Sequence, residues 1–421
     1  MNNDAFSLLV EQQAKDEYYT PVELMYGKTP GTFLSPFDYS KYLDFIDSND
    51  LSYITKLPLK TFNYKSIYYC LGADLISILH SYFSLVPNDD DFRNRFSKTF
   101  IESRIFSEIE GTLNVENVPT TRRRLRELLV DNVPVKDRND LIIKNMKEAI
   151  DFVHELPAFT KDNLFKLYKI LSNGCLDKEN ELKPGDYYRF DSVEISHYKG
   201  CPVSLIDECM DSLFNFVNDS LNDKNNDIYF LTILPHICHY YVLYIHPYFD
   251  YNGRTARMVS YWVYLLTGIE SFPPIISEAI NQTKNKYYKA LENSRDSHND
   301  ITYFLKYILN ISCDYIATYQ NLEYIESMAK QKGYTLTETE LNYMKRIMIS
   351  YEGKFSYGDF LKMANIEITK QGALKILNHF IDVGFLKEVE SKSNAKLFDI
   401  NKNSLLLLLK RFGVRHSKGE I

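Results

Sequence analysis

The sequence predicts a mainly α-helical protein with one small β-hairpin in its middle and a helix-and-hairpin unit near its C-terminus. Apolar residues recur at intervals of three and four along much of the chain, the period of one face of an α-helix. Residues 185–202 break this pattern, because they alternate in polarity and end in turn-forming residues, as a hairpin does. After residue 335, three helical segments precede two short strand-like segments, which is the order of a winged helix-turn-helix.

The length of 421 residues exceeds one typical hydrophobic core, so we expect two or three domains. Residues 1–95 are interpreted as an N-terminal helical region rich in Tyr, Phe and Leu. Residues 96–325 form the longest helical zone and contain the hairpin. Residues 335–415 form the predicted winged helix. Its three helices are expected at 337–351, 357–364 and 369–383.

The composition is ordinary for a folded protein, with 45% hydrophobic residues and a formal net charge of −7. This charge excludes a protein that coats nucleic acid over its whole surface, although a local basic face remains compatible with it. The six cysteines contain no Cys-x-x-Cys pair, which argues against a zinc ribbon, a redox pair or a disulfide framework. Neither a secretory signal nor an apolar stretch of about 20 residues is recognisable. We therefore expect a cytoplasmic protein without a membrane partner.

The most informative segment is 228–269, in which two apolar helical stripes are joined by the loop HPYFDYNGR, residues 246–254. The first helix is expected to end at His246, before a proline. Asn252 and Gly253 stand at the start of the second helix, so unpaired backbone N–H groups and the positive end of the helix dipole face the loop. Such a helix start is a ready anion-binding site.

The side chains of the same loop suit chemistry on a polyphosphate. Arg254 and Arg257 are three residues apart and therefore share one helix face, where two guanidinium groups can bind adjacent phosphates. Asp250 offers a hard oxygen ligand to Mg²⁺. His246 titrates near neutral pH and can accept a proton from an attacking hydroxyl. A base, a metal ligand and a phosphate site together indicate nucleotidyl or phosphoryl transfer.

The segment HPYFDYNGRTAR resembles the signature loop of the Fic family, whose usual form is His-Pro-Phe-x-Asp-Gly-Asn-Gly-Arg-x-x-Arg. His239, seven residues before His246, matches a recurrent family feature, and GDYYRFDSVEI is similar to the family's flap, which holds the target segment. KNKYYKALENSRD is similar to the stretch that borders the nucleotide, where Tyr288 would either line the nucleotide or pack in the core. The resemblance covers roughly residues 145–308 and implies a Fic-type helical core.

The resemblance implies a protein adenylyltransferase that uses ATP and Mg²⁺ to attach AMP to a Ser, Thr or Tyr hydroxyl of a target protein, which could be the chain itself. His246 would be the general base that activates the hydroxyl. Asp250 would hold Mg²⁺ against the phosphates. The hydroxyl would attack the α-phosphorus and release pyrophosphate.

The remaining motif residues would bind the nucleotide. By the resemblance, Asn252 and the backbone of Gly253 line the anion hole. Arg254 contacts the leaving phosphates, and Arg257 holds the γ-phosphate. Gly253 followed by Arg254 favours AMP transfer over the related death-on-curing kinases, which usually have Lys in place of that glycine.

Two motif positions depart from the usual form. Tyr248 replaces a Phe, a mild change if the ring is a core anchor. Tyr251 replaces a Gly, which would allow unusual backbone angles and a close approach of phosphate, so a tyrosine there is sterically penalised. We expect slow turnover or an altered preference for acceptor or nucleotide. A catalytically silent Fic scaffold therefore stays open as an alternative.

A second family element lies upstream, in SRIFSEIEGTLNV. The autoinhibitory motif of the family has a Ser or Thr four residues before a Glu that is followed by Gly or Asn. Glu110 and the glycine after it resemble this motif, although Phe106 occupies the Ser/Thr position and Ser107 lies one residue later. The resemblance implies that Glu110 pairs with Arg257 and blocks the γ-phosphate. The predicted inhibitory segment is 107–111.

Other features are weaker. His236 and His239 are spaced without the Glu of a zinc motif, so we expect structural roles for both. Lysines in the predicted winged helix could follow a DNA backbone, but nearby acidic residues dilute this face. These lysines are Lys370, Lys375, Lys392 and Lys396. A transcription regulator that binds DNA and only senses nucleotide remains an alternative, as does a domain that binds protein. The oligomeric state, including a homodimer, is left open.

Overall fold

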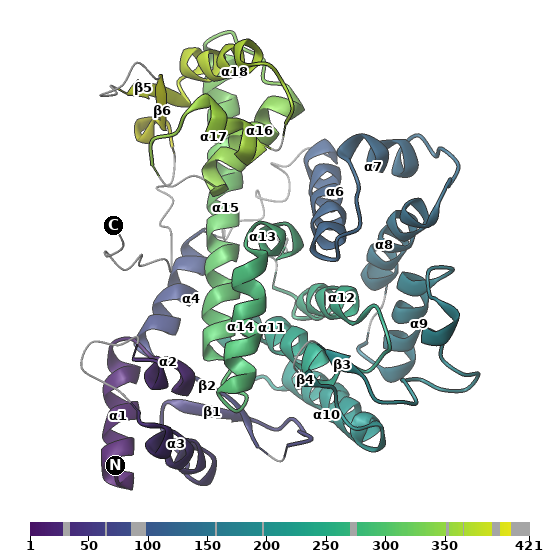
Figure 1. Ribbon diagram of the computed structural model, residues 1–421, viewed down its shortest axis with the longest axis vertical. Coiled ribbons are helices and arrows are strands. Elements are labelled where there is room, and N and C mark those ends of the chain that lie inside the picture. The colour runs from purple at the N-terminus through teal and green to yellow at the C-terminus, as the bar shows by residue number, and fades with distance from the viewer. Residues whose placement is uncertain are drawn as a thin grey trace. The chain divides into compact units, whose positions relative to one another are not determined.

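The computed structural model of the chain describes most of its residues, and the mainly α-helical fold is confirmed (Figure 1). The described residues are 1–27, 34–63, 65–85, 98–155, 158–195, 198–269, 276–350, 353–364, 366–389 and 396–405, without the side chains of 98–104, 349–350 and 404. Lys392 and the ends of two predicted regions, 86–95 and 406–415, lie outside them.

The chain forms two compact units, Met1–Leu309 and Asn310–Ile421. The first unit contains the predicted N-terminal region and most of the predicted core. Its helices are α1 (Asn3–Lys15), α2 (Pro21–Met25), α3 (Pro36–Ser48), α4 (Ala73–Leu85), α6 (Lys98–Val115), α7 (Arg122–Leu129), α8 (Arg138–Glu155), α9 (Lys161–Ser172), α10 (Val203–Asn222), α11 (Ile228–Ile245), α12 (Asn252–Leu266), α13 (Ile276–Gln282) and α14 (Lys284–Asp296). Helix α15 (Thr302–Gln331) begins in the first unit and continues into the second.

The core of the first unit is built around α11 and α12. Helix α11 is buried from Thr232 to its end except at Leu243, and α12 packs along it. By length and composition alone, α11 could cross a membrane, and it is the one such helix in the described part of the chain. Because 72% of it is buried inside the protein, its apolar character is explained by its central position. Trp262 on α12 is fully buried and packs edge-to-face on Phe159 at 4.7 Å between ring centroids.

The hairpins differ from the sequence-based expectation. The N-terminal region, predicted as helical, also contains an antiparallel hairpin of β1 (Ile54–Leu57) and β2 (Ile67–Cys70). Each strand has only four residues, too few for the period-two pattern to stand out. In the predicted hairpin 185–202, the paired strands are β3 (Glu194–Ile195) and β4 (Tyr198–Lys199), of two residues each. On either side of these strands, the backbone N–H groups of Arg189 and Cys201 donate to the carbonyls of Pro247 and Ile245 at the end of α11.

The N-terminal elements are joined to the start of α15 through a buried carboxylate. Asp300 is completely buried and accepts hydrogen bonds from the hydroxyl of Tyr18 at 2.8 Å and from the backbone N–H of Thr302 at 3.0 Å. Burial raises the pKa of Asp300 to about 6. Tyr68 of β2 adds backbone hydrogen bonds to residues on both sides of Asp300. These contacts attach the N-terminal region to the helical core.

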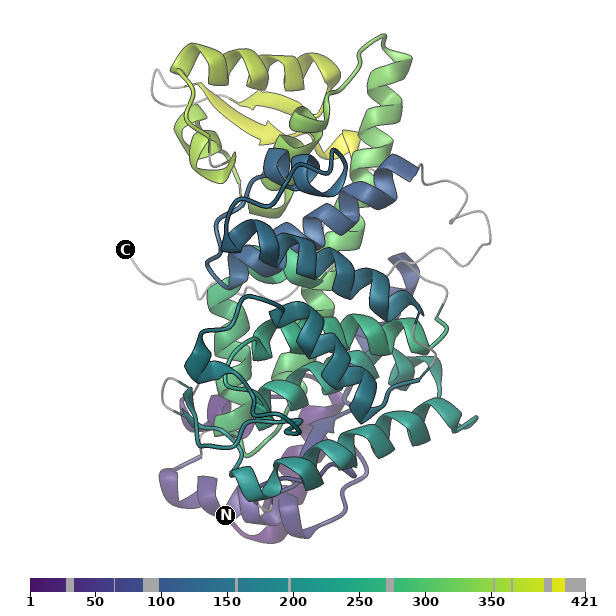
Figure 2. The same cartoon turned by 90° about the vertical axis from the view of Figure 1, so that its right-hand side faces the viewer.

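The second unit has the predicted order of elements. Helices α16 (Glu338–Ser350), α17 (Tyr357–Ala364) and α18 (Lys370–Val383) precede strands β5 (Leu386–Val389) and β6 (Leu397–Ile400), which pair antiparallel. Figure 2 shows these strands, in yellow, beside the helices of the same unit. Its assignment as a winged helix stays a prediction.

Two lysines of the predicted basic face already have local partners. Lys396 forms an ion pair with Glu388 at 2.8 Å, and Lys370 lies 5.1 Å from the ring centroid of Tyr357. Lys375 is exposed. The ion pair lowers the positive charge that this face offers to a DNA backbone. Binding of DNA stays a prediction.

Candidate functional site

The loop between α11 and α12 passes twice through left-handed backbone. His246 ends α11 with φ 54°, and its N–H donates to the Val242 carbonyl at 2.9 Å. Tyr251 precedes α12 with φ 68°, in the conformation for which the sequence analysis expected a glycine. The two turns place His246 and the start of α12 at opposite ends of one short loop. An imidazole and a helix N-terminus therefore belong to the same site.

Asn252 braces this loop from inside. Its side-chain Oδ1 accepts the N–H of Tyr248 at 3.0 Å, and its Nδ2 donates to the Tyr248 carbonyl at 2.8 Å. The Tyr248 ring is fully buried and stacks on Tyr168 at 3.6 Å between centroids, as predicted for a core anchor. The Asn252 side chain thus holds the backbone of Tyr248 in place, while the backbone N–H of Asn252 lies at the start of α12.

A buried arginine that the sequence analysis did not single out ties the flap to the loop. Arg189 is 2% exposed and donates to the His246 carbonyl at 2.8 Å, to the Asp191 carbonyl at 2.6 Å and to the Cys201 carbonyl. The backbone N–H of Arg189 donates to the Pro247 carbonyl at 2.9 Å. Arg189 therefore fixes the backbone at His246 relative to both ends of the flap. No sequence signal distinguishes it from a solvated arginine on a hairpin.

His246 is half-buried beside this arginine. Burial, assisted by the positive charge of Arg189, lowers the pKa of the imidazole to about 4, although a hydrogen bond with the Leu243 backbone opposes the shift. The imidazole is therefore neutral at pH 7 and can accept a proton. This is the protonation state that a general base requires.

The buried start of α12 carries a guanidinium group with unused hydrogen-bond donors. Arg254 is 6% exposed, and its Nε and Nη1 have no hydrogen-bond partner among the described residues. Its guanidinium carbon lies 3.5 Å from the ring centroid of Tyr251. Leaving buried charged donors unpaired is unfavourable, so such a group is expected where an anion completes the site.

Arg257 is paired with Glu116, and the predicted pairing with Glu110 is wrong. The Arg257 Nη2 lies 2.6 Å from Glu116 Oε1, and its Nε donates to the Thr112 hydroxyl at 2.7 Å. Glu110 instead forms an ion pair with Arg122 of α7, with 3.4 Å between the carboxylate oxygen and Nε. The hydroxyl of Ser107 accepts a hydrogen bond from the same Arg122. The predicted inhibitory segment 107–111 thus contacts α7, while Arg257 is bound by residues just C-terminal to it.

The sequence did contain the signal for Glu116. Thr112 stands four residues before Glu116, which is followed by Asn117, and this is the full Ser/Thr-x-x-x-Glu-Gly/Asn pattern. The structure gives a reason for its last position. Helix α6 ends at Val115, and Asn117 turns the chain away with φ 57°, a left-handed conformation that Gly and Asn adopt most readily.

The Glu116 carboxylate lies at the N-terminus of α12, where an anion is expected to bind. A Cβ atom added to Gly253 would lie 2.4 Å from Glu116 Oε1, so only a glycine admits the carboxylate this close. Burial raises the pKa of Glu116, but the charge and hydrogen bond of Arg257 and the charge of Arg254 outweigh it, and the net shift is downward. Glu116 is therefore an ionised carboxylate seated in the anion site.

Helix α6 is held in this place by close packing on α13. A Cβ atom added to Gly111 would lie 2.4 Å from the backbone nitrogen of Glu278 and 2.6 Å from the carbonyl carbon of Ser277. Glu108 is buried and accepts hydrogen bonds from the N–H and the hydroxyl of Ser277. These contacts fix the helix whose end presents Glu116.

We expect Gly111→Ala to lower the free energy of unfolding by about 1–3 kcal/mol, because its methyl group would meet rigid backbone rather than a movable side chain. Urea or thermal denaturation measures the loss. Gly358→Ala is the matched control, since its Cβ would have only an ordinary contact at 3.6 Å within a helix. Equal stability of Gly111→Ala and the wild type would contradict the close packing of α6 on α13.

The two tyrosines of α14 have different environments. Tyr287 is buried, and its hydroxyl is hydrogen-bonded to His239 Nε2 at 2.9 Å. Tyr288 is 47% exposed, which excludes the alternative of a core aromatic. Burial and the nearby charge of Glu116 raise its pKa. Tyr288 therefore lies near Glu116 with a free face, and His239 has a structural partner as predicted.

Asp250 is the carboxylate that the loop offers to a metal ion. It is half-buried, and its Oδ1 accepts the N–H of Tyr251 at 2.6 Å. The described residues contain no cluster of three or more His, Cys, Asp or Glu side chains placed to hold a metal. One carboxylate beside a phosphate site suits Mg²⁺, which takes most of its other ligands from phosphate and water. The donor set at Asp250 therefore fits magnesium bound together with a nucleotide.

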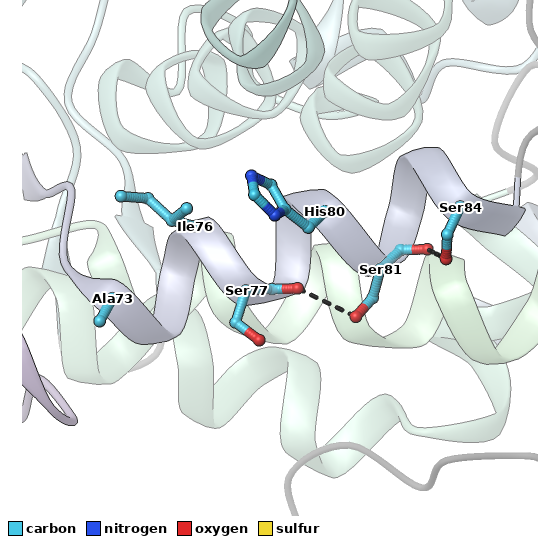
Figure 3. A pocket seen from close by; sticks show the side chains of 6 residues that line it. All are labelled: Ala73, Ile76, Ser77, His80, Ser81 and Ser84. Carbon is cyan, nitrogen blue, oxygen red and sulfur yellow. Dashed lines mark hydrogen bonds between the residues drawn. The ribbon is translucent and has the colours of Figure 1, made fainter.

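A separate pocket runs along α4 (Figure 3). The described residues that line it all belong to this one helix: Ala73, Ile76, Ser77, His80, Ser81 and Ser84. It shares no residue with the loop that follows α11. The pocket and the loop are different features of the first unit.

Comparisons with known proteins agree with the motif. The profile of the Fic/DOC family matches residues 158–264, which contain the flap, α11 and most of α12. The protein adenylyltransferase Fic of Nematostella vectensis is 24% identical over 219 residues, 50% of this chain and 48% of that protein. The protein adenylyltransferase fic-1 of Caenorhabditis elegans is 26% identical over 212 residues, 48% of this chain and 37% of that protein. The chain thus spans about half, or less, of the length of these curated relatives.

Solved structures give a weaker likeness. A Fic family protein from Desulfovibrio desulfuricans has a TM-score of 0.47 at 16% identity, over 79% of this chain and 97% of that one. Residues 134–508 of Fic-1 from C. elegans have a TM-score of 0.43 at 17% identity, over 59% and 73%. Residues 158–264 of the chain are therefore similar to the Fic/DOC family, and the curated relatives that match the chain are named for the same family.

Proposed function

We propose that this chain is a protein adenylyltransferase, which moves AMP from ATP to a Ser, Thr or Tyr hydroxyl of a target protein, itself included. The observation that carries the proposal is the anion site at the start of α12, where Arg254 keeps unpaired donors and Glu116 occupies the helix N-terminus. A neutral imidazole, His246, stands at the other end of the same loop. The names of the curated relatives support this class of reaction.

The proposed step uses these groups in a single displacement. The hydroxyl oxygen of the target forms a bond to the α-phosphorus as its proton passes to the His246 imidazole. The bond between the α-phosphorus and the bridging oxygen to the β-phosphate breaks, and pyrophosphate leaves. Arg254 and the N-terminal N–H groups of α12 would stabilise the charge on the phosphates. Asp250 would hold Mg²⁺, which neutralises phosphate charge when bound.

Glu116, rather than Glu110, is proposed to restrain this activity. The Arg257 guanidinium would hold the γ-phosphate by the family resemblance, and Glu116 and Thr112 already bind its Nη2 and Nε. ATP must therefore displace a buried, charge-assisted hydrogen bond before the γ-phosphate can reach Arg257. Adenylyl transfer is therefore best measured in a protein that lacks the Glu116 carboxylate.

The test uses ATP labelled at either end of its triphosphate, with the Glu116→Ala protein and Mg²⁺. Adenylyl transfer leaves protein-bound label from α-labelled ATP and none from γ-labelled ATP. Chelation of Mg²⁺ with EDTA is expected to abolish the product. Label from the γ-phosphate alone would show a kinase instead, and no label from either end would show a catalytically silent scaffold.

A further inference from the structure

Tyr251 stands where the Fic signature has a glycine, and its ring is not placed as an obstacle. The side chain is 2% exposed, and its hydroxyl faces the buried thiol of Cys175, away from solvent. The left-handed backbone at this residue costs about 1–2 kcal/mol for a residue with a Cβ atom. A position that keeps such a cost with a large buried ring is a candidate for a specific role.

The ring of Tyr251 supports the Arg254 guanidinium. A distance of 3.5 Å from the guanidinium carbon to the ring centroid is a close stacking contact. A π face attracts the cation without accepting its N–H groups at the edge, so Nε and Nη1 of Arg254 keep their hydrogen bonds available. Arg257 is held differently, since Thr112 and Glu116 accept hydrogen bonds from its Nε and Nη2.

We propose that Tyr251 is a positioning residue for nucleotide binding, which fixes the guanidinium plane of Arg254 by stacking and leaves its N–H edge free for the β- and γ-phosphates of ATP. This inference rests on the proposed function. Glycine at this position would leave Arg254 without its platform. Where the family has a flexible glycine, this chain thus has a tyrosine that orients Arg254 before the phosphates bind. This prearrangement lowers the entropy cost of nucleotide binding.

The competing explanation is that the ring only fills the core and that α12 places Arg254 by itself. The two explanations differ in what happens when the ring is replaced by a large aliphatic side chain. Loss of core packing alone would lower stability and leave relative nucleotide affinities unchanged. Loss of a stacking platform would weaken the binding of ligands that reach Arg254.

The experiment measures nucleotide dissociation constants by titration calorimetry in proteins that all carry Glu116→Ala, so that the anion site is open. Tyr251→Phe keeps the ring, while Tyr251→Leu and Tyr251→Met remove it. We expect Tyr251→Phe to bind ATP within about twofold of the tyrosine protein, and the two aliphatic variants to bind ATP on the order of tenfold more weakly. The dissociation constant for AMP, which has no β- or γ-phosphate, should change much less among these variants.

A double-mutant cycle tests whether the effect passes through Arg254. In an Arg254→Met background, replacing the ring should weaken ATP binding by no more than about twofold, because the stacked partner is absent. Equal ATP affinity of the folded Leu or Met variant and the Phe variant would overturn the inference while leaving the proposed function intact. Failure of the Glu116→Ala protein to bind ATP with Tyr251 intact would instead overturn the proposed function.

Discussion

Replacing Glu116 with alanine is expected to raise labelling of protein by α-labelled ATP on the order of 10- to 100-fold. The reason is the hydrogen bond of 2.6 Å between Arg257 and the Glu116 carboxylate, which ATP must break in the wild type. A hydrogen bond to a charged group contributes about 1.5–3 kcal/mol, which corresponds to this range of binding. The measurement compares initial rates of label incorporation at one ATP concentration below saturation.

Glu110→Ala is the matched control. Glu110 lies on α6, the helix that ends one residue before Glu116, has the same side chain and is paired with a different arginine, Arg122. We expect its labelling rate to stay at the wild-type level. Activation by Glu110→Ala without activation by Glu116→Ala would restore the interpretation that the sequence first suggested. Equal rates for all three proteins would show that neither carboxylate restrains the enzyme.

Thermal stability gives a second readout of the same contact. Without its carboxylate partner, Arg257 is left buried and uncompensated, so Glu116→Ala should melt at a lower temperature than the wild type. ATP should then raise the melting temperature of the variant more than that of the wild type, because it supplies the missing negative charge. A larger ATP shift in the wild type would contradict competition between ATP and Glu116.

The loop could be predicted from sequence because its chemistry depends on local spacing. The interval between Arg254 and Arg257 fixes their shared helix face, and the glycine usual at position 251 pointed to the positive φ that the structure has there. His246 was likewise identified by its place at the end of an apolar helix. Each of these inferences needs only the few residues on either side.

The inhibitory residue was misplaced for a physical reason. Glu110 lies on α6, whereas Glu116 follows the last residue of that helix, and the two carboxylates pair with different arginines, Arg122 and Arg257. Which of them reaches Arg257 depends on how α6 is placed, and α6 packs closely on α13 at Gly111. Matching the motif at Thr112 would have identified Glu116. The packing that orients the helix, however, cannot be predicted from a short sequence pattern.

Arg189 and the hairpin of β1 and β2 could not have been found from the sequence. The acceptors of Arg189 are three backbone carbonyls, which lie 2, 12 and 57 residues away, and a carbonyl gives no residue-type signal. The strands of the hairpin have four residues each, and they pair residues that are 10 to 16 positions apart in the sequence, such as Leu57 with Ile67 and Ile54 with Cys70. Long-range backbone contacts of both kinds become visible only once the chain is folded.

Replacing His246 with alanine is expected to reduce labelling by about 10²- to 10⁴-fold, because it removes the group that accepts the hydroxyl proton. The variant should be made in the Glu116→Ala protein, so that ATP binding can be measured in parallel and should remain nearly unchanged. A parallel loss of ATP binding would assign His246 to the nucleotide site, and an unchanged labelling rate would exclude it as the base.

The pH dependence of the active protein separates this role further. Burial and the charge of Arg189 set the pKa of His246 at about 4, so the imidazole is neutral well below its usual titration range. Protonation removes the base only as the pH falls toward this value, and the labelling rate should therefore stay level from about pH 8 down to about pH 5. A fall centred near pH 6.5 would mean that the imidazole titrates as if it were in water. In that case neither the buried position of His246 nor its neighbour Arg189 would be controlling the proton transfer.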